Sequence, residues 1–218
     1  MKKLFLVIAL LIGSTAEAQE VKWGFTGRFG AFATFTNDDN FEESSHYGLG
    51  LQAALGAWVN FPVDAKSNLQ ISVLQVAERQ RAGETVMIDE NRNPITKATI
   101  TDQNLAVVLQ ALYLYSLSDK WSAGLGAGAK YEFLSQYKMK ALLTYHPANP
   151  NYSEEWEFKD DNPYRRKTTL HLPIETQYRL NDKFTLVGQV QLPLNSRTAE
   201  TSYKEYDVNL SAGINYAW

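Results

Sequence analysis

Tyr206-Asp207-Val208-Asn209-Leu210-Ser211-Ala212-Gly213-Ile214-Asn215-Tyr216-Ala217-Trp218 closes the chain, and this stretch decides the fold. Aromatic and aliphatic residues stand at the even positions, whereas nearly every odd position is polar or small. Because successive side chains of a β-strand point to opposite faces, this alternation gives the strand one apolar and one polar face. A helix would distribute both sets around its axis. The segment therefore predicts one long β-strand.

The same alternation recurs in seven segments upstream of this strand. They cover residues 22–36, 47–61, a segment from about 69, 105–117, 121–133, 170–180 and 184–194. The third segment loses its alternation near Gln75, where we expect a β-bulge. The sequence thus predicts an all-β domain of about eight antiparallel strands, with ten as the alternative.

The connections between these segments alternate in length. Short turns are expected at 62–67, 118–120 and 181–182. Longer loops are expected at 37–46, about 83–103, about 138–167 and 195–203. Short turns on one side, long loops on the other and both termini on the short-turn side are typical of bacterial transmembrane β-barrels. We therefore predict one up-and-down barrel.

The first eighteen residues have the layout of a signal peptide. Lys2 and Lys3 provide a positive start, residues 4–12 are apolar, and Ala16-Glu17-Ala18 has the small-x-small pattern of a cleavage site. We expect an exported protein whose barrel domain comprises residues 19–218.

Composition excludes several classes of protein. Loss of Lys2, Lys3 and Glu17 changes the net charge from −3 to −4, which argues against a nucleic-acid partner. The chain has no cysteine, so we expect neither disulfides nor a thiolate metal site, and we expect no cofactor. After residue 18 no apolar run approaches the roughly 20 residues of a transmembrane helix. Only a closed barrel would then let the chain cross a bilayer.

Two sets of aromatic residues fall at the two ends of the apolar faces, with aliphatic residues between them. The set near the short turns is Trp23, Phe61, Tyr115, Trp121, Tyr178, Phe184, Tyr216 and Trp218. The set near the long loops is Phe35, Tyr47, Tyr131, Phe133 and Tyr206. Paired aromatic girdles around an aliphatic band indicate a lipid-facing wall. The alternative is a soluble lipocalin-like barrel, in which the apolar face would line the interior.

The polar face carries glycines and charged residues in mid-strand. Glycine suits the crowded interior of a narrow barrel, and buried charges need partners. We expect a polar network in the lumen, made of Arg28, Lys130, Glu132, His171, Glu175, Arg179 and Asp207. This network would form a fixed plug or, alternatively, line a narrow pore for ions or small solutes.

These features together resemble the small outer-membrane β-barrel proteins of the OmpA/OmpX-like and Bacteroidota PorT-like kind. The resemblance rests on the signal peptide, the eight alternating segments and the C-terminal run 208–218. It implies the outer membrane of a Gram-negative bacterium, lipid as the surrounding partner and termini in the periplasm. An alternating last strand that ends in an aromatic residue looks like the signal that the barrel-assembly machinery reads in this family.

The loop expected at 138–167 is rich in acidic and aromatic residues. Tyr152, Trp156 and Phe158 are candidates for contact with an extracellular ligand. The alternative is a solvated loop, or an extension of the two flanking strands above the membrane. An acidic stretch at 38–43 does not have the spacing of an EF-hand, and we predict no metal site there.

The role we expect is structural or interactive, without enzymatic activity, and a porin-like channel is the alternative. A lipid-modifying enzyme is the third hypothesis. Pro173 and Pro193 nearly face each other in adjacent strands, so they look like the lateral gate of the outer-membrane lipid A palmitoyltransferase.

Overall fold

The computed structural model describes residues 21–38, 48–88, 94–143, 154–161, 165–199 and 203–218. The predicted signal peptide and the predicted contact residue Tyr152 lie outside these residues, as does Tyr47 of the predicted girdle.

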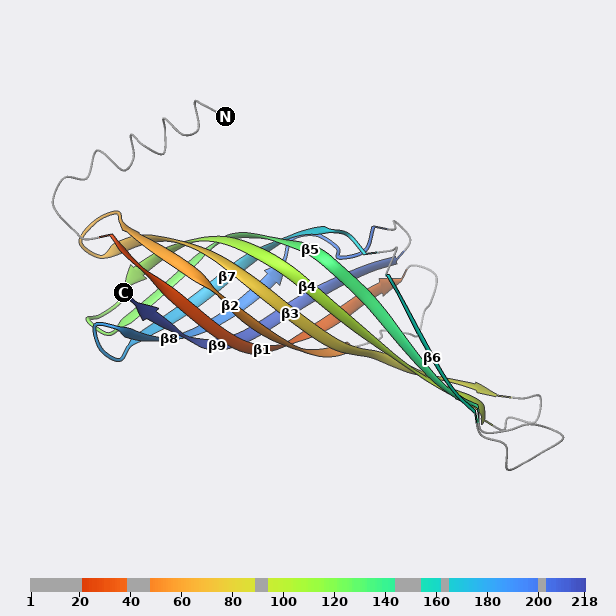
Figure 1. Ribbon diagram of the computed structural model, residues 1–218. Coiled ribbons are helices and arrows are strands. Elements are labelled where there is room, and N and C mark those ends of the chain that lie inside the picture. The colour runs from red at the N-terminus through yellow and green to blue at the C-terminus, as the bar shows by residue number, and fades with distance from the viewer. Residues whose placement is uncertain (1–20, 39–47, 89–93, 144–153, 162–164, 200–202) are drawn as a thin grey trace.

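Nine antiparallel strands form a single sheet, and eight of them close into a barrel (Figure 1). The strands are β1 (Lys22–Asp38), β2 (Gly48–Pro62), β3 (Ser67–Ile88), β4 (Pro94–Ser116), β5 (Trp121–Leu143), β6 (Glu154–Asp161), β7 (Thr168–Arg179), β8 (Phe184–Pro193) and β9 (Tyr203–Ala217). Among the described residues, successive strands pair along the chain except β6 and β7; β9 pairs with β1, and β7 pairs with β5. Within the described residues β6 pairs only with β5, outside the ring. The predicted eight-stranded up-and-down barrel is confirmed, and the ten-strand alternative is wrong.

The three short turns share one hydrogen-bonding pattern, which explains where the strands end. Asp64, Ser118 and Asn181 each accept hydrogen bonds through a side-chain oxygen from the backbone N–H groups two and three residues ahead. Such side chains replace the ladder hydrogen bonds that the backbone gives up as it reverses. All three turns lie at the same end of the barrel as the start of β1 and the end of β9, as Figure 1 shows.

At the other end a four-stranded sheet projects beyond the barrel (Figure 1). It consists of the upper parts of β3, β4 and β5, together with β6. The pairing of β2 with β3 stops at Arg81, and the pairing of β7 with β5 stops at Tyr131. Register shifts between Arg81 and Gly83 and between Leu105 and Ala106 mark the height at which the sheet leaves the ring. Bulges bend and twist a strand, so they suit this departure.

Two predictions about the connections are therefore wrong. The loop expected at about 83–103 is mostly strand, because β3 continues to Ile88 and β4 begins at Pro94. The loop expected at 138–167 contains the end of β5 and the whole of β6, which is the predicted alternative of a strand extension. The bulge expected near Gln75 is absent from β3 there, and the register shift lies further along, after Arg81.

The apolar set of side chains faces outward and the polar set faces the lumen. Phe29, Leu49 and Leu55 are 62%, 72% and 72% exposed on the outer surface. Arg28 and Glu175, which belong to the opposite set, are 6% and 1% exposed. The barrel is thus inverted relative to a soluble lipocalin-like barrel, whose exterior is polar.

Candidate functional site: the lumen of the barrel

A small aliphatic cluster interrupts the polar lining of the lumen. Ala54, Leu74, Val76 and Val108 form a buried cluster on the inner faces of β2, β3 and β4. Leu112 is fully buried on the same side. The predicted polar lumen is therefore polar except at this cluster, since Gln70, Glu78 and Gln110 on the same strands are also buried. Close packing of the aliphatic groups narrows the space left for water.

A charged layer near the turn end crosses the lumen. Arg28 Nη1 lies 3.0 Å from Glu175 Oε2, and both side chains are buried. Gln177 and Gln189 each donate a 2.7 Å hydrogen bond to the Glu175 carboxylate. Gln189 also exchanges hydrogen bonds with Gln110 from the opposite wall. Because a buried carboxylate needs several donors, this layer fixes strands β1, β4, β7 and β8 to one another.

The second layer surrounds a single lysine. Lys130 Nζ lies 2.8 Å from both carboxylate oxygens of Glu78 and 3.0 Å from Glu132 Oε1. Glu132 Oε2 lies 3.2 Å from Arg165 Nε. These side chains are at most 8% exposed. Two cations and two carboxylates therefore balance one another in the middle of the barrel.

The third layer lies at the long-loop end and is built around Arg197, which follows β8. Its guanidinium lies 3.2 Å from Asp102 Oδ2, 2.8 Å from Glu205 Oε2 and 2.7 Å from Asp207 Oδ1. Thr34 also accepts a hydrogen bond from Arg197. Burial lowers the pKa of Arg197, but Asp207 and the neighbouring carboxylates outweigh burial and hold that pKa above its usual value.

The predicted lumen residues have different positions in these layers. Arg28, Lys130, Glu132, Glu175 and Asp207 belong to them. His171 is buried on the inner face of β7, with its Nε2 atom 3.3 Å from Gln110 Nε2. Arg179 does not belong to the network. It is exposed at the turn end, where it donates a hydrogen bond to the backbone oxygen of Asp119.

Five charged residues of the network escaped the sequence analysis: Glu78, Asp102, Arg165, Arg197 and Glu205. Glu78 was missed because Leu74 and Val76, which precede it on the inner face, are apolar. The sequence therefore did not show which residues of β3 face the lumen. Arg165 and Arg197 lie outside the named strands and reach the lumen from connecting segments, joined through a bridge from Arg165 to Thr198. The alternation of a strand carries no information about side chains that enter from a loop.

The two prolines leave the seam between β7 and β8 intact, contrary to the loosening expected there. Leu194 N donates a hydrogen bond to Leu170 O directly opposite. In an antiparallel pair alternate residues bond to the same neighbour, so the backbone N–H and C=O groups of the even-numbered residues of β7 point to β8. Pro173 is odd-numbered and its missing N–H faces β5, where the ladder is interrupted between Leu125 and Gly128. Pro193 ends the ladder between β8 and β9, whose last pair joins Gln191 to Asn209.

The aromatic residues lie where the strands approach the two ends of the barrel. Near the turns, ring contacts join Trp23 to Trp218, Trp121 to Tyr178 and Phe184 to Tyr216. Tyr115 is exposed and Phe61 is half-buried at the same end. Near the long-loop end Phe35, Tyr131 and Phe133 are exposed, and Tyr206, opposite Phe35, is half-buried. Of the predicted loop contacts, Trp156 and Phe158 lie on β6.

In the described part of the chain, no helix is long and apolar enough to cross a membrane. Among the same residues, no group of histidine and carboxylate side chains is arranged to hold a metal ion. What the described lumen offers chemically is a stack of ion pairs whose members hold one another in place.

No protein-family model matches the sequence, and no curated protein matches it. Solved structures similar to this chain include Ail, the attachment invasion locus protein of Yersinia pestis, at 11% identity and a TM-score of 0.39. That comparison covers 89% of this chain and 99% of Ail. Neisserial surface protein A is 11% identical with a TM-score of 0.45, over 92% of this chain and 100% of its own. CarO of Acinetobacter baumannii is 12% identical with a TM-score of 0.40, over 87% of this chain and 97% of its own.

Proposed function

We propose that this chain is an integral β-barrel of the outer membrane of a Gram-negative bacterium, with a non-enzymatic role. Its lumen is closed by the three charged layers, and its work is to hold the projecting sheet outside the membrane for interaction with an extracellular partner. The short turns and both termini face the periplasm, and the barrel-assembly machinery reads the last strand, β9.

The observation that carries this proposal is the inverted polarity of the barrel. Large apolar side chains are exposed on every strand of the ring, including Phe25, Leu51, Leu109, Leu125 and Leu210. A continuous apolar exterior is far larger than the patches of a few hundred Å² that soluble monomers expose. Lipid solvates such a surface, and the closed ladder leaves the spanning backbone paired.

The projecting sheet supports the interactive role. Beyond the barrel, β6 forms one edge of this sheet and the part of β3 after Arg81 forms the other. An unpaired strand edge presents backbone N–H and C=O groups to whatever approaches it. Lys138 and Lys140 of β5 pair with Glu157 of β6, which keeps the edge strand attached to the sheet. Trp156 and Phe158, on the same edge strand, are the aromatic candidates for partner contact.

The five tryptophans test the membrane location. Trp121 is 48% exposed on the outer wall, whereas Trp58 is 7% exposed in the lumen, with its indole N–H bonded to Phe25 O. In vesicles that contain brominated lipid, we expect quenching of Trp121 fluorescence and much weaker quenching of Trp58. The measurement uses variants that keep one tryptophan each. Equal quenching of the two residues, or none for Trp121, contradicts a lipid-facing outer wall.

Because the charged layers close the lumen, we expect the barrel not to conduct ions. In a planar bilayer, with insertion verified, we expect the unmodified protein to show no discrete conductance steps. The Glu132→Gln and Arg28→Gln variants should stay silent as well, because each change leaves two other charged layers and the aliphatic cluster in place. Discrete openings in the unmodified protein, altered in amplitude by these substitutions, would instead establish the channel function.

A further inference from the structure

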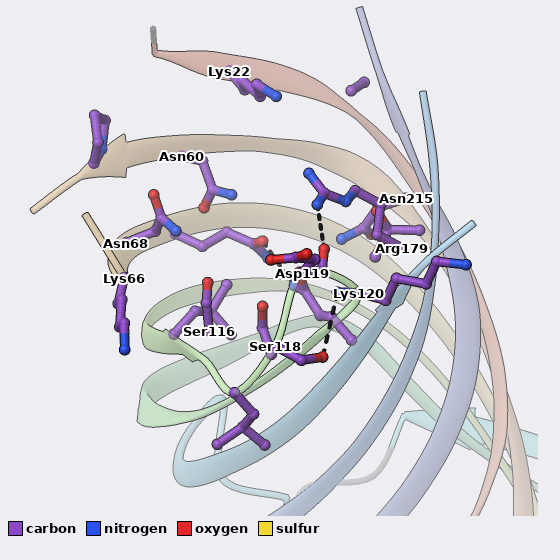
Figure 2. Close-up of a pocket in the computed structure, with 18 of the residues that line it drawn as sticks. Lys22, Asn60, Lys66, Asn68, Ser116, Ser118, Asp119, Lys120, Arg179 and Asn215 are labelled. Atoms are coloured by element: carbon purple, nitrogen blue, oxygen red, sulfur yellow. Dashed lines mark hydrogen bonds between the residues drawn. The ribbon is translucent and has the colours of Figure 1, made fainter. Parts of the chain in front are cut away.

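A cavity of about 660 Å³ opens at the turn end of the barrel (Figure 2). Its wall combines the turn-side ends of all eight strands of the ring with the three short turns. On the lumen side lie Gln70 and Gln177, which are joined by a 3.0 Å hydrogen bond. Gln177 in turn bonds to Glu175, which belongs to the first charged layer. The cavity is therefore a cup, open at one end and bounded by the ion-paired layer at the other.

The deep part of the cup carries buried amide atoms that have no hydrogen-bond partner among the described residues. They are Gln70 Nε2, Asn60 Oδ1 and Asn215 Oδ1. Gln70 is 1% exposed and Asn215 is 3% exposed. A buried polar group without a partner is costly, so these atoms indicate a polar occupant. Such an occupant has to offer an acceptor to Gln70 and donors to the two asparagines.

The mouth of the cup has an excess of positive charge. Lys22, Lys66, Lys120 and Arg179 line it, together with three carboxylates. One of these carboxylates, Asp64, already accepts two backbone hydrogen bonds within its turn, which lower its pKa. Four cations against three carboxylates leave a net charge of +1 at the mouth, so an anionic group there would gain from the cations.

We propose that this cup binds a small acidic sugar. Its carboxylate lies at the mouth against Arg179 and Lys120, and its hydroxyl and amide groups reach the buried amides. A sugar supplies both donors and acceptors, as the three unpartnered atoms require. The volume falls within the range of about 300–1,000 Å³ that is usual for ligand pockets. The inference does not depend on the proposed membrane location, because ligand binding to the cup is measured on protein in detergent.

The test is isothermal titration of the full chain in detergent with N-acetylmuramic acid. N-Acetylglucosamine, which lacks the carboxylate, is the matched ligand. We expect saturable binding of the acidic sugar and at least about tenfold weaker binding of the neutral one, as the loss of charge-assisted bonds requires. Arg179→Gln should weaken the acidic sugar about tenfold for the same reason.

Two further variants make the test decisive. Asn60→Asp keeps the shape of the side chain but places a carboxylate in the cup, so it should weaken the acidic sugar more than the neutral one. Lys183→Gln removes a cation from the same end of the barrel that does not line the cup, and it should leave binding unchanged. Absence of saturable binding, equal affinity for the two sugars, or equal weakening by Lys183→Gln and Arg179→Gln each overturns the proposal.

Discussion

Replacing Lys130 with methionine should lower the free energy of unfolding by about 3–5 kcal/mol, the usual cost of removing one partner from a buried ion pair. Lys130 neutralises Glu78 and Glu132 at 2.8–3.0 Å, and all three side chains are buried. Methionine has a similar length, so the change removes the charge without opening a large void. The measurement is urea unfolding of the barrel in lipid vesicles, followed by tryptophan fluorescence.

A second substitution separates charge from packing. In the double variant Lys130→Met, Glu78→Gln, the remaining carboxylate of Glu132 keeps Arg165 at 3.2 Å. We therefore expect the double variant to recover more than half of the lost stability. The surface change Lys183→Met should have no measurable effect, because that residue is exposed at a turn. Equal stability of Lys130→Met and the unmodified protein would show that the middle layer contributes nothing to the fold.

Gly126→Ala is expected to damage the barrel wall severely, although it adds only one methyl group. A Cβ atom at Gly126 would lie 1.9 Å from the backbone oxygen of Ala111 on β4. That oxygen belongs to a paired strand, so relief requires the backbones of β4 and β5 to separate. We expect a loss of at least about 2–3 kcal/mol, at the upper end of the cost of overpacking, and a large fall in refolding yield.

Gly188→Ala is the matched control for this prediction. The nearest atom to a Cβ at Gly188 is Thr176 Cγ2 at 3.4 Å, an ordinary contact with a side chain. Both substitutions add one methyl group to a strand of the same barrel, at Gly126 on the inner face against a backbone oxygen and at Gly188 on the outer face against a side chain. The yield of heat-modifiable folded protein on a gel measures the outcome. Similar yields for the two variants would mean that β4 and β5 are not held as closely as the structure has them.

The barrel itself was predictable because one face of each strand meets an apolar environment and the other meets the lumen. Because of that contrast, apolar and polar residues alternate in segments such as 206–218 and 105–117. The short turns were predictable for a related reason. Asp64 and Asn181 are residue types whose side chains replace backbone partners in a turn.

The projecting sheet could not be predicted in the same way. Beyond Arg81 the strands leave the barrel, and no contrast between lipid and lumen acts on their two faces. Residues 96–101 accordingly mix threonine, lysine, alanine and isoleucine without a regular period. The strands there pair through backbone hydrogen bonds, which do not require a particular pattern of side chains.

The lumen network was predictable only where its members stand in regular strands. Arg28, Lys130 and Glu175 stand at polar positions of clear alternating patterns and were found for that reason. Arg197 lies outside the named strands, and only the closed barrel brings it to Asp102, far away in the sequence. The aliphatic cluster in the lumen was missed because Leu74 and Val76 resemble outward-facing residues in any reading by hydropathy alone.

The pairing of β1 with β9 has a consequence for how the protein folds. Gly24 pairs with Ala217, so this contact joins nearly the two ends of the ring-forming chain. The entropy lost in closing a loop rises with its length, so contacts between distant segments form late and slow the reaction. The hairpins β2–β3, β4–β5 and β7–β8 need only local turns and can form first. Until the ends meet, the growing sheet has two unprotected edges, and that intermediate is the species most exposed to aggregation.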